Sequence, residues 1–235
     1  FVLDTGPAPV LSATPGDIRL ERGAEGGLLI RCDGAALGAP VTEAEAPAAA
    51  LTLARWFCAA GGIDAGGRGR MAALIARGAR PSGALTPRLP PAPALAPPTP
   101  GTCTPQGLLL GLAFGQISAP HLAALSRLGP LRLTPWRMLL LEGAAPDLLD
   151  LPDLRDLPGL ILRADDPMAR VIACTGAPGC QQALAPVRAL AAHLAAQVPP
   201  GARLHVSGCA KGCAHPARAD LTLLATATGF DLIRQ

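Results

Sequence analysis

A proline-rich segment near the middle of the chain limits what this sequence can fold into more than any other feature. Nine prolines lie among the 25 residues from 81 to 105. Proline lacks the backbone N–H donor that helices and central strands require, so this stretch can form neither. We therefore expect a linker at residues 81–105, with one folded part before it and another after it.

Before the linker, short apolar runs alternate with turns. Runs of β type at 1–4, 17–20 and 27–31 are separated by glycine and proline and predict a small meander of three strands. Segments rich in alanine and leucine predict helices at 48–60 and 71–77.

After the linker, the sequence predicts strands that alternate with helices. Ser118 is a typical N-cap for a helix that follows the first of these strands. The expected elements are a strand at 108–114, extended chain at 131–141, strands at 170–173 and 204–206, a helix at 181–197 interrupted near its start by Pro186, and a hairpin of 221–224 with 230–233. This alternation predicts an α+β or mixed α/β class.

Composition excludes two classes of function. Aromatic residues are 3% of the chain, tyrosine is absent and the formal net charge is only +3, which argues against nucleic-acid binding. The apolar runs are broken well short of the roughly 18 residues that a membrane span needs, and no secretory signal is recognised. We therefore expect a cytoplasmic protein without a membrane partner.

Because the chain begins with Phe1, we also expect it to be a fragment.

Four of the seven cysteines form two closely spaced pairs. Cys174 and Cys180 have the spacing C-x5-C, Cys209 and Cys213 have the spacing C-x3-C, and 28 residues separate the pairs. Each pair follows a predicted strand and lies among glycines and prolines, which allow a loop to bring thiolates together. Four thiols on turns of a protein without a secretory signal indicate a metal site rather than disulfides.

The spacing favours an iron–sulfur cluster over zinc. Structural zinc commonly uses pairs separated by two to four residues, and the first pair here is wider. A 4Fe-4S cluster is larger and accepts wider loops. Zinc and a redox disulfide remain alternatives. The other cysteines are isolated and are expected to be small apolar residues or incidental thiols, namely Cys32, Cys58 and Cys103.

Four motifs in the second half resemble a known enzyme family. They are Gly111-Leu-Ala-Phe-Gly-Gln116, Leu131-Arg-Leu-Thr-Pro-Trp-Arg137, Ala173-Cys-Thr-Gly-Ala-Pro-Gly-Cys180 and His205-Val-Ser-Gly-Cys-Ala-Lys-Gly-Cys-Ala-His-Pro216. The cysteine spacing is similar to that of sirohaem-type nitrite and sulfite reductases. The motifs as a set look like the precorrin-3B synthase family within that superfamily, with the N-terminal part of the family's chain apparently lacking.

The resemblance implies a fold and its division into parts. The implied class is α+β, with a ferredoxin-like half-domain and a sirohaem-reductase-type mixed α/β domain that carries an iron–sulfur cluster. In numbers, we expect residues 1–80 to be a remnant of a first sirohaem-reductase-type half, 81–105 the linker, 106–145 the ferredoxin-like half-domain, and 146–235 the half that binds the 4Fe-4S cluster.

The resemblance also implies an activity in aerobic cobalamin biosynthesis. Family members convert precorrin-3A to precorrin-3B with O2 and an electron donor, hydroxylating C20 and forming a γ-lactone. By similarity, the cluster ligands are Cys174, Cys180, Cys209 and Cys213. A further mononuclear non-haem iron is implied for the family, and His205, His215 and Asp220 are candidate ligands.

The tetrapyrrole substrate carries several carboxylates, so its site requires fixed cations. Arg132 and Arg137 flank the Thr134-Pro135 turn, and the matching segment in sirohaem relatives favours Arg132. Lys211 is the only lysine of the chain and lies inside the second cysteine pair, where it would raise the cluster's potential or meet a substrate carboxylate. No residue is assigned a catalytic role.

Two alternatives remain at this point. One is a sirohaem-dependent nitrite or sulfite reductase, which would hold sirohaem as a further cofactor. The other is a non-catalytic, cluster-bearing fragment that needs a partner chain.

Overall fold

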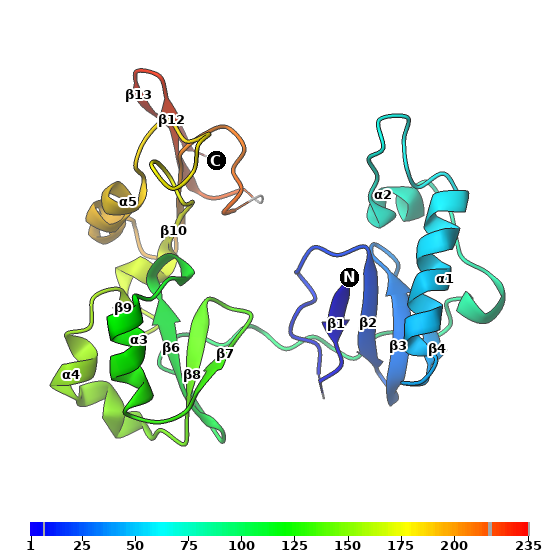
Figure 1. Cartoon of the computed structure of the whole chain (residues 1–235), viewed down its shortest axis with the longest axis horizontal. Helices are drawn as coiled ribbons and strands as arrows, with labels where there is room; N and C mark the ends of the chain where they lie inside the picture. The colour runs from blue at the N-terminus through cyan, green and yellow to red at the C-terminus, as the bar shows by residue number, and fades with distance from the viewer. Residues whose placement is uncertain (7, 216–217, 235) are drawn as a thin grey trace. The chain divides into compact units, whose positions relative to one another are not determined.

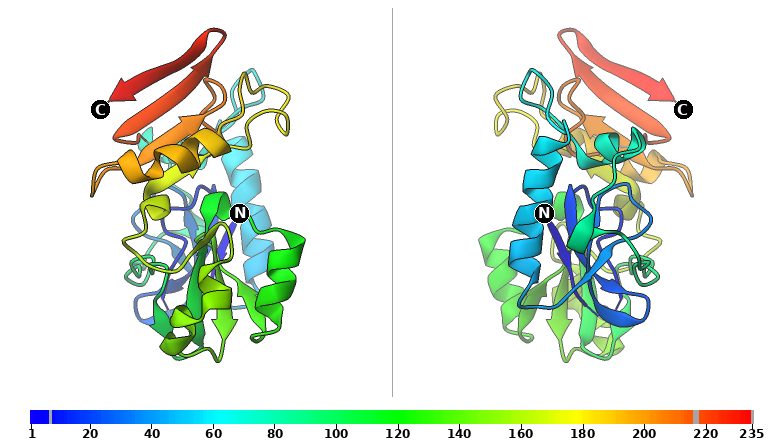
Figure 2. Two further views of the ribbon diagram at one scale, coloured as in Figure 1. Left: turned by 90° about the vertical axis from the view of Figure 1, so that its left-hand side faces the viewer. Right: turned by 90° about the vertical axis from the view of Figure 1, so that its right-hand side faces the viewer.

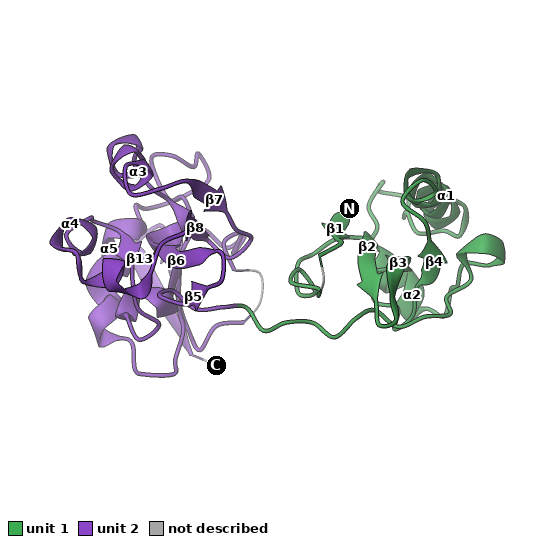
Figure 3. Cartoon of the chain, turned by 90° about the horizontal axis from the view of Figure 1, so that it is seen from below, with its two compact units in different colours: residues 1–97 green, residues 98–235 purple. Residues whose placement is uncertain are grey.

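The computed structural model of the chain describes residues 1–6, 8–215 and 218–234. The chain forms two compact units, residues 1–97 and 98–235 (Figure 3). The boundary between the units falls inside the proline-rich segment 81–105.

The first unit is built on a four-stranded sheet in the order β1-β2-β3-β4 (Figure 1). Its strands are β1 (Val2–Asp4), β2 (Ile18–Gly23), β3 (Gly26–Cys32) and β4 (Ala39–Val41). The three predicted strands are confirmed, but the predicted meander is wrong because β1 runs parallel to β2. The connection of 13 residues between β1 and β2 is long enough to return the chain for parallel pairing.

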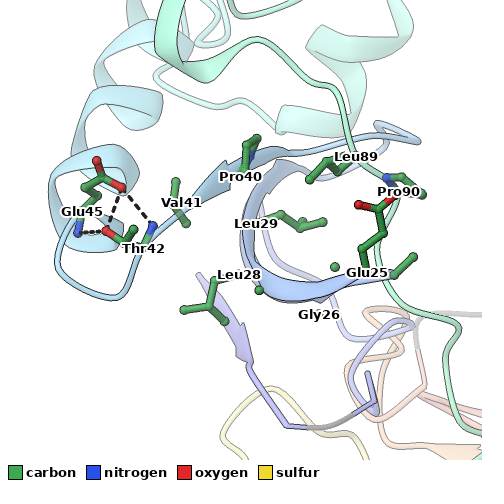
Figure 4. Close-up of a pocket in the computed structure, with 13 residues that line it drawn as sticks. Glu25, Gly26, Leu28, Leu29, Pro40, Val41, Thr42, Glu45, Leu89 and Pro90 are labelled. Carbon is green, nitrogen blue, oxygen red and sulfur yellow. Dashed lines mark hydrogen bonds between the residues drawn. The ribbon is translucent and has the colours of Figure 1, made fainter.

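Two helices, α1 (Ala46–Ala59) and α2 (Met71–Ala76), pack against β3, and α1 also contacts β2. A short 3-10 turn, η1 (Gly83–Leu85), follows them. Thr42 and Glu45 form a reciprocal cap before α1: the Thr42 hydroxyl donates to Glu45 Oε2 at 2.7 Å, and the Glu45 N–H lies 3.3 Å from the Thr42 hydroxyl (Figure 4). This cap lines an open pocket of about 400 Å³ beside the β2–β3 turn.

The side of this sheet away from the helices carries a buried charge network. Arg19 and Glu21 alternate along β2 on the same face, and each is 1% exposed. Glu21 accepts hydrogen bonds from Arg19 Nε at 2.8 Å and from Arg31 Nε at 2.7 Å. Arg19 also donates to the Leu11 carbonyl at 2.7 Å, so the loop after β1 closes over the network. Each buried charge therefore has hydrogen-bonding partners.

The second unit begins with a five-stranded antiparallel sheet in the order β5-β6-β8-β7, with β9 pairing to β6. Its elements are β5 (Cys103–Thr104), β6 (Gly107–Leu112), η2 (Ala113–Gly115), α3 (Ala119–Ser126), β7 (Leu131–Leu133), β8 (Met138–Glu142), η3 (Pro146–Asp150), α4 (Pro152–Arg155) and β9 (Leu160–Ile161). Ser118 caps α3 as expected, accepting from the His121 N–H at 3.3 Å. Because β9 belongs to this sheet, the sheet extends past residue 145, where we expected the half-domain to end.

A second sheet follows, in the order β10-β11-β12-β13. Its elements are η4 (Pro167–Arg170), β10 (Val171–Ala173), α5 (Arg188–Leu194), η5 (Ala195–Gln197), β11 (Leu204–Ser207), β12 (Leu221–Thr226) and β13 (Gly229–Arg234). β10, β11 and β12 are parallel, and β13 returns as the predicted hairpin, drawn in red in Figure 2. The helix predicted from residue 181 begins only at Arg188, because the segment before Pro186 is used in a loop that bonds to the second cysteine loop.

The core of this second half lies between α5 and the parallel strands. Val171, Val187, Ala191 and Val206 are at most 5% exposed and pack together. Among the helices of the described part, none is both long and apolar enough to cross a membrane.

Candidate functional site

The two cysteine pairs lie on loops that leave neighbouring parallel strands at the same edge of the sheet. Cys174 directly follows β10, and Cys209 comes two residues after β11 ends. The carboxyl ends of adjacent parallel strands meet at one edge, which is the usual place for a site in such sheets. The prediction that each pair follows a strand is therefore confirmed.

A hydrogen bond to sulfur joins the two loops. The Gly208 N–H donates to Cys174 Sγ at 3.2 Å, and the Cys174 N–H donates to the Val206 carbonyl at 3.3 Å. The Leu184 N–H donates to the Gly208 carbonyl at 2.8 Å, so both polar groups of Gly208 bond to the first loop. The half-buried Cys174 thiol thus lies against the backbone of the second loop.

Each loop is also closed internally. In the first, the Cys180 N–H donates to the Gly176 carbonyl at 2.8 Å, and Gly176 has a φ of +68°, a value that favours glycine. In the second, the Ser207 hydroxyl donates to the Cys209 carbonyl at 2.7 Å. Cys180 and Cys209 are half-buried, whereas Cys213 is exposed.

Gly208 has no room for a side chain, which leads to a stability prediction. A Cβ at this position would lie 2.8 Å from the Cβ of Ala183 in the first loop. We expect Gly208→Ala to lower the free energy of unfolding of the second unit by about 2 kcal/mol, because the loops must separate to admit the methyl group. Urea denaturation followed by circular dichroism measures this loss.

The matched control is the double variant Gly208→Ala with Ala183→Gly. It removes the methyl group that the new Cβ would meet, so it should recover at least half of the lost stability. No recovery would contradict the close approach of the two loops.

Two histidines lie beside the second cysteine loop. The rings of His205 and His215 are edge to face with centroids 5.8 Å apart, and the Nε2 atom of each is buried without a hydrogen-bond partner among the described residues. Burial lowers the pKa of His205, and the nearby charges of His215 and Arg137 lower it further. His205 is therefore favoured as a neutral imidazole at pH 7.

Of the two predicted arginines, Arg137 is the one that reaches this region. Its guanidinium donates to the Ala214 carbonyl, next to Cys213, at 3.0 Å. Arg137 has a φ of +60°, an uncommon left-handed value for a residue other than glycine. Arg132 lies on the edge strand β7 and pairs with Glu142 at 2.5 Å, with 69% of its side chain exposed.

Sequence reasoning missed one arginine at the site. Arg188, the first residue of α5, donates to the Cys174 carbonyl at 3.2 Å and also bonds to Gln116 after η2. It thereby connects the first cysteine loop to the segment between η2 and α3. Nothing in its local sequence indicates this contact, because the partners are 14 and 72 positions away along the chain.

The other candidate and motif residues lie in different surroundings from Arg137 and the two histidines. Lys211 is exposed on the second cysteine loop. Asp220 precedes β12 at the opposite end of the strands, where its carboxylate accepts from the Arg203 N–H at 2.8 Å. Trp136, from the second motif, packs against the small core cluster that includes Met138, and its indole N–H has no partner in the described part of the chain. Pro216, the last residue of the fourth motif, lies outside the described residues.

The donor set suits an iron–sulfur cluster in its chemistry. Thiolates are the protein ligands of such clusters, and backbone N–H groups aimed at their sulfurs help to set the potential, as the Gly208 N–H is aimed at Cys174. Within residues 1–6, 8–215 and 218–234, no three His, Cys, Asp or Glu side chains are gathered closely enough to hold a metal ion. The structure thus brings the two loops together at Gly208 and Cys174, but it gathers neither three of the four cysteines nor the candidate iron ligands His205, His215 and Asp220.

Comparison with solved structures identifies the class of fold. The chain is similar to the NirA protein of Mycobacterium tuberculosis, with a TM-score of 0.59 and 21% sequence identity, over 90% of this chain and 47% of that one. The mixed α/β class predicted from the sequence is confirmed. No protein-family model matches the chain.

Comparison with curated proteins finds one relative with a named activity. Over 135 residues the chain is 32% identical to the precorrin-3B synthase of a Sinorhizobium species, a match that covers 53% of this chain and 29% of the relative. The resemblance to precorrin-3B synthase seen in the motifs is therefore confirmed. The chain spans less than a third of this relative and about half of NirA.

Proposed function

We propose that this chain is part of an iron–sulfur oxidoreductase of aerobic cobalamin biosynthesis that converts precorrin-3A to precorrin-3B. The reaction would be an O2-dependent hydroxylation at C20 with formation of a γ-lactone, supplied with electrons by a donor. The observation that carries the proposal is the joining of the two cysteine loops through the Gly208 N–H and Cys174 Sγ. The similarity to precorrin-3B synthase supplies the substrate.

Four cysteines would hold a 4Fe-4S cluster between the loops, namely Cys174, Cys180, Cys209 and Cys213. When bound, such a cluster passes single electrons. The Gly208 N–H would donate to the sulfur of Cys174 in the bound state, a contact that helps to set the potential of such a cluster. Arg188 would hold the first loop in place through the Cys174 carbonyl.

Arg137 is the best placed of the candidate substrate cations. Its guanidinium meets only a carbonyl oxygen in the described part of the chain, so its charge stays available for a substrate carboxylate. The charge of Arg132 is already balanced by Glu142. Lys211 is exposed on the cysteine loop and would offer a third cation. Within the described ranges the Nε2 atoms of His205 and His215 have no partner, so they would hydrogen-bond to the substrate or to a water molecule.

Anaerobic purification of the chain tests the cluster. We expect a brown protein with about four irons and four acid-labile sulfides per chain. Iron analysis and visible and electron paramagnetic resonance spectra provide the measurement. A colourless protein that holds one zinc would contradict the cluster, whereas a sirohaem absorption band would favour the nitrite or sulfite reductase alternative.

A further inference from the structure

A polar cavity lies at the end of the sheet opposite to the cysteine loops. It has a volume of about 440 Å³, and its lining residues include those that directly precede the parallel strands. Arg170 directly precedes β10, Arg203 directly precedes β11, and Asp220 directly precedes β12. Because β11 is four residues long, about 13 Å of strand separates this cavity from the second cysteine loop. The cavity is therefore a separate place on the molecule.

Positive charge dominates this cavity. Its lining includes three arginines, Arg170, Arg203 and Arg218, against one acidic residue, Asp220. None of the three takes part in an ion pair among the residues that the structure describes. One oxygen of Asp220 accepts from the Arg203 backbone N–H at 2.8 Å, so this carboxylate is hydrogen-bonded to the backbone and not to an arginine side chain.

The first of these arginines is held in position by the fold. Arg170 donates to the Val198 carbonyl at 3.2 Å, while its buried Nε has no partner in the described residues. Arg203 and Arg218 are exposed, and their side chains make no hydrogen bond within the described ranges. The rest of the lining has small side chains or none and leaves space between the cations, namely Ala169, Gly201, Ala202 and Ala219.

We propose that this cavity binds a phosphate-type oxyanion that carries two or more negative charges. Three guanidinium groups against one carboxylate leave an excess of two positive charges, which a dianion would balance. Planar guanidinium groups match phosphate oxygens with two parallel hydrogen bonds, and the contact with the Val198 carbonyl holds one of the three, that of Arg170, in place before the anion binds. Free phosphate, pyrophosphate and the phosphates of a nucleotide share this chemistry.

Isothermal titration calorimetry of the full chain with inorganic phosphate and with pyrophosphate tests the proposal. We expect saturable binding at one site per chain, with pyrophosphate tighter than phosphate. Arg203→Gln and Arg218→Gln should each weaken pyrophosphate binding about tenfold, since each removes a charge-assisted hydrogen bond at an exposed position. Neither side chain has a partner in the described fold, so both variants should keep the circular dichroism spectrum of the parent chain.

The matched control is Arg127→Gln, which removes the same charge from an exposed position at the end of α3, outside the cavity. It should leave pyrophosphate affinity unchanged. Equal weakening by Arg127→Gln, or no saturable binding to the parent chain, would overturn the proposal. Titration with ADP then identifies the source of the anion: tighter binding than pyrophosphate indicates a nucleotide, and equal or weaker binding indicates the free oxyanion.

Discussion

Replacing any one of Cys174, Cys180, Cys209 or Cys213 with serine is expected to reduce bound iron from about four atoms per chain to less than one. Soft thiolates select iron–sulfur clusters, and a serine hydroxyl is a harder ligand that is protonated at neutral pH. A cluster that loses one of four ligands is also open to solvent. Iron and sulfide analysis of protein purified without oxygen measures the loss, and circular dichroism establishes that each variant is folded.

The chain offers matched controls for this experiment. Cys58 and Cys103 are exposed cysteines outside the two loops, and serine at either position should leave the iron content unchanged. Cys32 is a less suitable control because its thiol is buried, which raises its pKa to about 11, and serine there would disturb the core. If Cys58→Ser or Cys103→Ser removed as much iron as the loop variants, the proposed ligand set would be wrong.

The second large expected effect is a loss of stability of the first unit. Glu21→Gln is expected to lower the free energy of unfolding of residues 1–97 by about 3 kcal/mol. The substitution keeps the shape of the side chain but removes the negative charge between Arg19 and Arg31, which leaves Arg19 buried with less compensation. Breaking one side of a buried ion pair costs more than the pair itself contributes, because the remaining charge stays desolvated.

The two tryptophans allow the units to be followed separately. Trp56 packs against the core of the first unit and Trp136 lies in the second. In a Trp136→Phe background, urea denaturation followed by tryptophan fluorescence reports the first unit alone. Glu25→Gln is the control, because Glu25 is exposed and its loss should change stability by less than about 0.5 kcal/mol. If Glu21→Gln lowered the free energy of unfolding by less than about 1 kcal/mol, the buried network of Arg19, Glu21 and Arg31 would not be an important source of stability.

The same network predicts a pH dependence. Burial opposes ionisation of Glu21, but hydrogen bonds and charge from Arg31 and Arg19 outweigh it and leave the pKa lowered. A carboxyl whose pKa is lower in the folded state stabilises fully above its unfolded pKa of about 4.3, and this contribution is lost as pH falls through the folded value. The stability of the first unit should therefore decline below about pH 4, and Glu21→Gln should remove part of that decline.

Local chemistry made much of the secondary structure predictable. Ser118 caps α3 because a short hydroxyl side chain can accept from a backbone N–H at a helix start. Apolar runs bounded by turn residues located most strands of both units, whereas the short strands β4, β5 and β9 were not predicted. The parallel pairing of β1 with β2 was not predictable in this way, since an apolar run has the same pattern in either direction.

Sequence and tertiary structure contribute different parts of the candidate site. The sequence by itself determined the two cysteine pairs, their glycine-rich loops and the strands before them, because spacing and turn chemistry act over a few residues. Only the tertiary structure decided that Gly208 bonds to Cys174, that Arg137 rather than Arg132 reaches the second loop, and that Arg188 supports the first. It also decided that Arg170, Arg203 and Arg218 share one cavity. These contacts join residues up to 77 positions apart, and strand order and packing, which no local pattern encodes, bring them together.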